Sequence, residues 1–144
     1  GLSLSEISLC YHLKQTHIMT TQEVAEKLVS LCRQGKYEEV YQELYSADVK
    51  SVEPEGSSWP TVQGMAEIAK KGEIWTNMVE EVLESEISDP LVAENFFTIT
   101  MKSKVKAKGS LEPFNMDEVC VYEVQEGKIV LEQFFYTPVP QEVV

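Results

Sequence analysis

The first half of the chain carries apolar residues at the spacing of amphipathic helices. Residues 20–23 (TTQE) form a capping box, in which a threonine is followed three positions later by a glutamate. Apolar positions then recur every three or four residues until Gly35, a residue type that commonly ends a helix. The same periodicity predicts a short helix at residues 37–44 and a third at about 62–78, with an extended run at 48–53 between them.

From about residue 79 the pattern changes to a period of two, which is typical of strands. Strands are expected at residues 80–88, 91–107, 115–124 and 128–137, and the QEGK run between the last two is a hairpin turn. Helices followed by a run of antiparallel strands predict an α+β domain. A long curved sheet with helices on one face would leave an internal cavity between them, a usual place for a ligand.

Composition is that of an ordinary globular protein. The 144 residues are 43% hydrophobic and 25% charged, and no apolar run is long enough to cross a membrane. We divide the chain into a leader or non-native extension, residues 1–18, and one domain, residues 19–144. The three cysteines have no CxxC spacing, so we expect a reducing, cytoplasmic location without disulfides or a thiolate zinc site.

Charge argues against nucleic acid as a partner. The formal net charge is −12 and Arg33 is the single arginine, whereas nucleic-acid-binding domains present a basic face with arginine forks. The one lysine-rich run alternates along the expected strand 91–107, and glutamates of the same parity precede it on the strand 80–88. Cross-strand pairing on a solvated sheet face accounts for both sets.

Histidine is missing from the domain. Both histidines, His12 and His17, lie in the expected leader. The domain therefore lacks the residues for Ser-His-Asp chemistry, Cys-His chemistry and His-ligated metal sites. Acid-base chemistry would fall to carboxylates, tyrosines or lysines, and we expect neither a metal nor an organic cofactor.

Two stretches, residues 25–56 and 121–136, resemble the nuclear-transport-factor-2-like superfamily, specifically its SnoaL-like branch, which is similar to ketosteroid isomerases and polyketide cyclases. The resemblance extends over residues 19 to about 137. It implies a cone-shaped roll of curved antiparallel sheet wrapped around helices, open at one end, and usually a homodimer. It does not imply one activity, because this fold hosts isomerases, cyclases, dehydratases and proteins that only bind.

The resemblance points to Glu53 as a candidate general base. Ketosteroid isomerases carry a catalytic aspartate directly before a Pro-x-Gly, and Glu53 occupies that position in the run E-P-E-G. Pro54 biases Glu53 toward an extended conformation, so Val49, Ser51 and Glu53 would share the cavity-facing side of the strand. A carboxylate in an apolar cavity is suited to act as a base near neutrality. The alternative is an exposed turn carboxylate.

The rest of the isomerase site is less complete. The tyrosine that donates to the developing enolate in that family falls at Leu28 here. The protonated acid that assists it aligns with Glu118 if one residue is inserted in the hairpin, and otherwise with Val119. Asp117 and Glu118 must point to opposite faces of their strand, so only one of them can face the cavity.

Seven further residues are candidates for contact with a ligand, with ordinary core packing as the alternative for each. They are Trp59, Trp75, Phe96, Thr98, Met116, Phe134 and Tyr136. The alternation of residues 96–101 shows that one set must face inward, either Phe96, Thr98 and Thr100 or Phe97, Ile99 and Met101, without showing which.

We therefore expect a SnoaL-like protein that binds a small apolar or weakly polar organic molecule. Its activity would be that of a cofactor-free isomerase, cyclase or dehydratase, with Glu53 as the base and Glu118 or a tyrosine polarising a carbonyl group. The alternative is a non-catalytic ligand-binding or dimerisation module of the same fold. A homodimer would use the Val- and Phe-rich last two strands.

Overall fold

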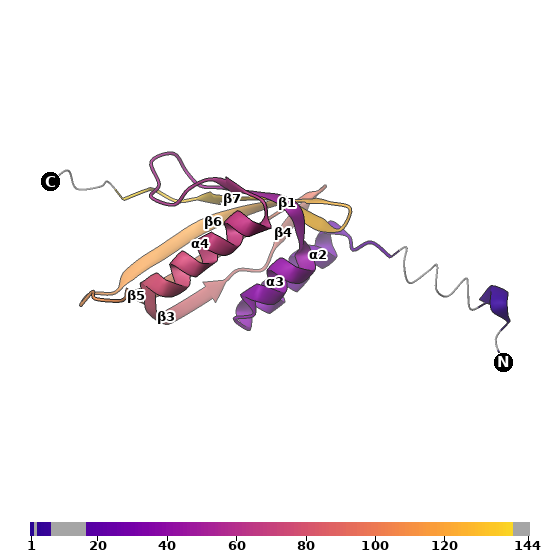
Figure 1. Ribbon diagram of the computed structural model, residues 1–144, viewed down its shortest axis with the longest axis horizontal. Coiled ribbons are helices and arrows are strands. Elements are labelled where there is room, and N and C mark those ends of the chain that lie inside the picture. Colours follow the sequence, from indigo (N-terminus) through magenta and orange to yellow (C-terminus); the bar gives the residue numbers. More distant parts are fainter. Residues whose placement is uncertain (2, 7–16, 140–144) are drawn as a thin grey trace.

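A curved, open sheet with helices on one of its faces makes up the fold (Figure 1). The computed structural model describes residues 1, 3–6 and 17–139. The helices are α2 (Thr21–Arg33), α3 (Tyr37–Leu44) and α4 (Met65–Met78), and the strands are β1 (Tyr45–Val52), β2 (Val62–Gln63), β3 (Val79–Ile87), β4 (Leu91–Ala93), β5 (Phe96–Ala107), β6 (Phe114–Gln125) and β7 (Lys128–Phe135). The α+β class and the order of the elements are as the sequence predicts. Of the predicted leader, residues 2 and 7–16 lie outside the described residues.

Helix α2 begins at the predicted capping box. The Thr20 side chain accepts a hydrogen bond from the Glu23 amide at 3.1 Å, and the Glu23 carboxylate accepts one from the Thr20 amide at 3.0 Å. The apolar face of the helix, which includes Val24 and Leu28, is fully buried against the sheet. None of the helices in the described ranges is long and apolar enough to span a membrane.

The sheet has the strand order β2-β1-β7-β6-β5-β3, with β4 also paired to β5. Strands β5, β6 and β7 are antiparallel neighbours, whereas β1 lies parallel to β7. The predicted pairing of charges on a solvated face is confirmed, since Glu84 lies opposite Lys104 and Glu86 lies opposite Lys102.

Two predicted elements are each divided in the structure. The expected strand 91–107 is the hairpin of β4 and β5, because the chain turns at Glu94, whose φ is 57°. The expected helix 62–78 begins only at Met65, since β2 precedes it and Gly64 has a φ of 92°. Left-handed backbone at either position is incompatible with a continuous strand or helix.

The inner face of the sheet, toward the helices, holds the core. Phe97 on β5 and Tyr122 on β6 lie opposite each other and stack with ring centroids 4.7 Å apart. Ile99 and Cys120 form the next buried pair along the same strands. The set Phe97, Ile99 and Met101 therefore faces inward.

The β6–β7 hairpin closes on a glycine with no room for a side chain. Glu126 and Gly127 have φ values of 53° and 73°, the left-handed pair typical of a two-residue hairpin turn. A Cβ atom at Gly127 would lie 2.8 Å from Cγ2 of Ile18 and 3.1 Å from the amide nitrogen of Met19. The turn is thereby packed against the segment that leads into α2.

Gly127→Ala is expected to destabilise the protein more than Gly109→Ala. Both glycines have a left-handed φ, but a Cβ at Gly109 meets nothing within 4 Å, so it controls for backbone strain. Overpacking typically costs about 1–3 kcal/mol, and we expect a difference of that size in the free energy of unfolding measured with urea. Equal losses in the two variants would contradict the tight packing of this turn.

Candidate functional site

Glu53 lies just beyond the end of β1, in a turn that fixes its direction. The Ser57 amide donates to the Pro54 carbonyl at 3.1 Å, and Gly56 has a φ of 86°, so the E-P-E-G run turns back on itself directly after Glu53. The Glu53 amide donates to the Thr61 hydroxyl at 3.0 Å. The side chain is only 8% exposed, so Glu53 is not the exposed turn carboxylate of the alternative interpretation.

Two side chains from distant parts of the chain hold the Glu53 carboxylate. Nζ of Lys71, on α4, lies 2.8 Å from Oε1, and the Tyr136 hydroxyl donates to Oε2 at 2.7 Å. Ser57 hydrogen-bonds the Tyr136 hydroxyl in turn, at 2.5 Å. The predicted site residues Glu53 and Tyr136 are thus in direct contact, and Lys71 completes the group.

The hydrogen bonds continue from Lys71 into the interior. Lys71 donates to the Ser51 hydroxyl at 3.2 Å, and Ser51 donates to Oε1 of Glu132 at 2.7 Å. Tyr45 donates to the other oxygen of Glu132. We call this connected set the buried polar cluster; it consists of Tyr45, Ser51, Glu53, Ser57, Lys71, Glu132 and Tyr136. Within the described residues, no buried side-chain nitrogen or oxygen lacks a hydrogen-bond partner.

Carboxyl groups near the cluster are shifted toward their neutral form. Burial raises the pKa of Glu118 to about 7, the nearby Glu53 and Glu132 carboxylates act in the same direction, and Lys71 opposes them. Burial also raises the pKa of Glu132, against the hydrogen bonds from Tyr45 and Ser51. Asp117 is exposed, so Glu118 is the member of that pair that faces inward, as alternation requires.

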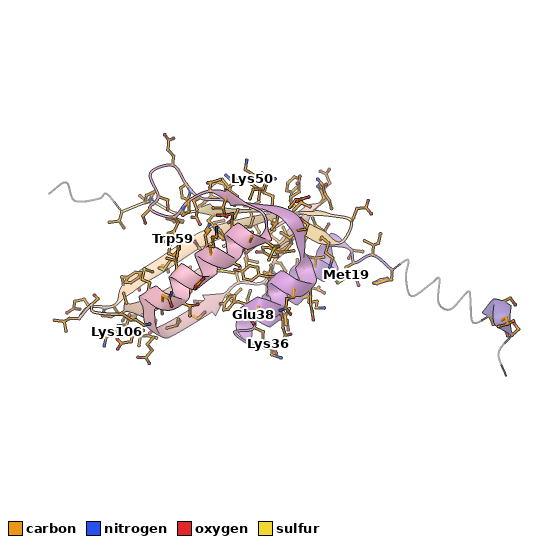
Figure 2. All side chains as sticks on the ribbon, in the orientation of Figure 1. Met19, Lys36, Glu38, Lys50, Trp59 and Lys106 are labelled. Carbon is orange, nitrogen blue, oxygen red and sulfur yellow. The ribbon has the colours of Figure 1, made fainter. Side chains whose placement is uncertain are left out.

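Aromatic side chains lie beside the polar groups. Trp59 lies next to α4 (Figure 2), with its ring centroid 6.4 Å from that of Trp75. Phe134, on the inner face of β7, presents its ring 5.7 Å from the Lys71 ammonium. Met116 follows the same inward parity as Glu118 on β6.

Phe96 and Thr98 are not part of this arrangement. Since Phe97 and Ile99 face the helices, Phe96 and Thr98 lie on the outer face of β5, and Thr98 donates to the Cys120 carbonyl there. They therefore do not line the inner face of the sheet, a point that the alternation left open because a period of two defines two faces without saying which one is covered.

We did not predict from the sequence that Lys71 and Glu132 belong to the site, although the position of each in its periodic pattern indicates that it faces inward. Lys71 lies three residues after Ile68 and four before Trp75, so it falls on the apolar stripe of α4 rather than on the solvated face. Glu132 has the same parity as Phe134, so an inward Phe134 implies an inward Glu132.

Other features give no second site. Two surface depressions lie away from the buried polar cluster, one of about 330 Å³ near Arg33 and Asp89 and one of about 420 Å³ between Glu86 and Lys102. In the part of the chain that the structure describes, no group of three or more His, Cys, Asp or Glu side chains could hold a metal ion. The region around Glu53 therefore combines a paired carboxylate, an ammonium group and a carboxyl group of raised pKa, with aromatic side chains nearby.

The fold has matches among known proteins. The family described as "SnoaL-like domain" matches residues 19–136. A protein from Mesorhizobium loti that is named a "putative SnoaL-like polyketide cyclase" superposes with a TM-score of 0.76 at 29% identity, covering 82% of this chain and 100% of that one. A protein with a ketosteroid isomerase-like fold from Catenulispora acidiphila, in complex with trimethylamine, gives 0.65 at 21% identity, covering 82% and 88%. A protein of unknown function from Burkholderia pseudomallei gives 0.68 at 14%, covering 83% and 92%. The last two show the fold alone, and no curated protein matches the chain.

Glu118 should make the protein less stable as the pH rises. Its pKa is about 7 in the folded state and near 4.5 in the unfolded chain, so the folded state binds more protons between these values. The free energy of unfolding should therefore fall from about pH 4.5 to about pH 7, with Glu132 contributing in the same direction. For Glu118 the loss is on the order of 2–3 kcal/mol.

Glu118→Gln should remove this part of the pH dependence. Its free energy of unfolding relative to that of the wild type, as measured with urea, should therefore be higher at pH 8 than at pH 5. Asp117→Asn is the matched control, because Asp117 is exposed on the opposite face of the same strand. A pH profile unchanged by Glu118→Gln would contradict the buried position of this carboxyl group.

Proposed function

The chain belongs to the SnoaL-like domain family, and from this membership and the geometry at Glu53 we propose that it binds a small apolar or weakly polar organic molecule and transfers a proton to and from one of its carbon atoms. The observation that carries the proposal is the buried Glu53 carboxylate, held from both sides by Lys71 and Tyr136. The reaction class is that of an isomerase, cyclase or dehydratase.

The two carboxyl groups suit different roles. Each oxygen of the Glu53 carboxylate has two lone pairs and accepts one hydrogen bond from its fixed partner, so a lone pair remains to take a proton from substrate. Glu118, with its raised pKa of about 7, is partly protonated at neutral pH and can donate a hydrogen bond to a carbonyl oxygen. Such a proton transfer needs neither a metal nor an organic cofactor.

The walls of the site suit a partly aromatic or polyketone-like ligand. Trp59, Trp75, Phe134 and Met116 supply apolar surface beside the carboxyl groups. The name of the Mesorhizobium loti protein is "putative SnoaL-like polyketide cyclase", and polyketides carry carbonyl groups with acidic neighbouring C–H bonds. A cytoplasmic location fits Cys32 and Cys120, which are both free and buried.

One observation favours the alternative, a non-catalytic module. Every buried polar atom of the described side chains is already satisfied by another protein group. A cluster that satisfies itself needs no ligand to complete it, and buried polar networks of this kind can simply specify one packing arrangement. The catalytic and the non-catalytic function are distinguished by whether proton transfer depends on Glu53.

Glu53→Gln is expected to abolish proton transfer with little effect on ligand affinity. We propose to follow the exchange of C–H hydrogen for deuterium in D₂O by NMR, across a panel of cyclic and linear β-diketones, because exchange reports the step without knowledge of the product. Loss of the base should reduce the rate by about 100-fold or more. Glu55→Gln, an exposed substitution in the same turn, is the matched control.

Equal exchange rates in wild type and Glu53→Gln would exclude Glu53 from the mechanism and favour the non-catalytic module. Because Glu53→Gln leaves Lys71 without its carboxylate, folding of the variant must be confirmed by thermal unfolding. Breaking a buried ion pair typically costs about 3–5 kcal/mol. Glu53→Gln combined with Lys71→Met removes both charges and provides a second variant without an unpaired ion.

We further propose that the protein is a homodimer that associates through the outer face of the sheet. Val119 and Phe135 lie opposite each other on β6 and β7 and are 42% and 48% exposed. Phe96 on β5 and Leu91 on β4 add exposed apolar side chains to the same outer face, with Thr98 and Thr100 between them and Val119. An apolar patch on a sheet face is typical of an interaction surface, and a second copy of the chain offers a complementary one.

Val119→Lys should shift the protein from dimer to monomer. An ammonium at the centre of the patch would be buried without a partner in the dimer, which should raise the dissociation constant by about 100-fold or more. Asn115→Lys adds the same charge to the same face of β6, outside the patch, and should leave the dimer intact. Analytical ultracentrifugation measures both, and a monomeric wild type would contradict the proposal.

A further inference from the structure

We propose that the Lys71 ammonium is the charged electrophile of this site and that, beside the neutral hydrogen bond from Glu118, it stabilises the enolate oxygen formed when Glu53 removes a proton from the carbon next to a carbonyl group. The inference rests on the proposed function and deepens it, because it identifies the substrate as a ketone-like compound that binds with its carbonyl oxygen toward Lys71. Four features of the structure lead to it.

The first feature is the donor geometry of Lys71. An ammonium group has three N–H bonds, and two of them are directed at Oε1 of Glu53 (2.8 Å) and at Oγ of Ser51 (3.2 Å). The side chain is 13% exposed, so the head group is held by these contacts and not by water. Among the described residues these are the two hydrogen-bond acceptors of Lys71, and the Phe134 ring lies 5.7 Å from its nitrogen, so the third N–H has no protein acceptor there.

The second feature is the distance between the base and the cation. In a carbonyl compound the carbon that loses its proton lies about 2.4 Å from the carbonyl oxygen, as the bond lengths of about 1.5 and 1.2 Å require. The Glu53 oxygen and the Lys71 nitrogen are 2.8 Å apart. A substrate can therefore place its C–H against Glu53 and its oxygen against Lys71 at the same time.

The third feature is the path of the negative charge. As the C–H bond breaks, its proton bonds to Glu53, its electron pair forms a C=C bond, and the carbonyl π electrons move to oxygen. The charge thus passes from the carboxylate to the enolate while Lys71 remains next to both. Its partner Ser51 donates its own proton to Glu132 and so keeps a lone pair toward Lys71, which holds the ammonium when Glu53 becomes neutral.

The fourth feature is that the nearby hydroxyl groups already donate hydrogen bonds to protein groups or lie in the core. Tyr136 donates to Glu53, and Tyr45 donates to Glu132. Tyr122 is buried in the core, where it stacks on Phe97. Lys71 is the charged donor in contact with Glu53, and an opposite charge stabilises an oxyanion more strongly than a neutral hydroxyl does.

The test uses 4-nitrophenol, whose phenolate is a stable analogue of an enolate and is coloured, so that absorbance reports the ionised fraction of the bound phenol. Wild-type protein should favour the phenolate by about tenfold or more over Lys71→Met, because an opposite charge at contact distance favours the ionised form. Glu53→Gln should favour the phenolate further, since Lys71 loses its competing anion. A purely structural role for Lys71 predicts neither change.

Two variants keep the result interpretable. Glu53→Gln combined with Lys71→Met leaves no unpaired buried charge and should ionise the phenol less than Glu53→Gln alone, because these two variants differ only in the Lys71 ammonium. Lys70→Met is the matched control, because the neighbouring Lys70 is exposed and pairs with Glu67 on the surface of α4. An unchanged phenolate fraction in Lys71→Met, or no preference for phenolate in wild type and Glu53→Gln, would overturn the assignment of Lys71.

The outcome is separate from that of the deuterium-exchange experiment. Phenolate binding that depends on Lys71, together with exchange that does not depend on Glu53, would remove the base and leave the oxyanion site in place. Exchange that depends on Glu53, without any effect of Lys71 on phenol ionisation, would keep the proposed proton transfer and reject Lys71 as its electrophile.

Discussion

A carboxyl group removed from water must find its hydrogen bonds inside the protein, and the interior of this fold is arranged around that constraint. Glu53, Glu118 and Glu132 all lie on the inner side of the sheet, yet only one ammonium group, that of Lys71, joins their cluster in the described residues. One ion pair and two carboxyl groups with raised pKa values are the physical solution, because three ionised carboxylates so close together would repel one another.

The same constraint couples activity to stability. An apolar core of equal volume would have a more favourable free energy of folding than a polar network in which every group needs its partner. The buried carboxylates have three hydroxyl partners, Ser51, Tyr45 and Tyr136. This arrangement is understandable only if the carboxylates take part in function, or if they specify the packing of α4 on the sheet. In either case the cluster is the part of the molecule where substitutions have the largest combined effect on function and folding.

The sequence predicts elements better than it predicts faces. The capping box at Thr20 and the turn at Gly127 are local chemistry, so α2 and the last hairpin were predictable from the sequence. The inward position of Glu53 was also predictable, since proline directly after it restricts its backbone. The choice between Phe96 and Phe97 depends instead on which side the helices cover, and the role of Lys71 depends on how far its stem reaches. Both are tertiary facts that no local pattern contains.

The parallel pairing of β1 with β7 also sets the order in which the molecule can be completed. Glu53 and Tyr136 are 83 positions apart, and Ser51 and Glu132 are 81 apart, yet each pair is in contact because the two strands end side by side. During synthesis, β1 and α4 emerge from the ribosome well before their neighbour in the sheet exists. Such long-range pairing requires the closure of long loops, which slows folding compared with contacts between elements that are neighbours in the sequence. Until β7 docks, the nascent chain carries an unfinished strand edge, which is a point at which a chaperone would act.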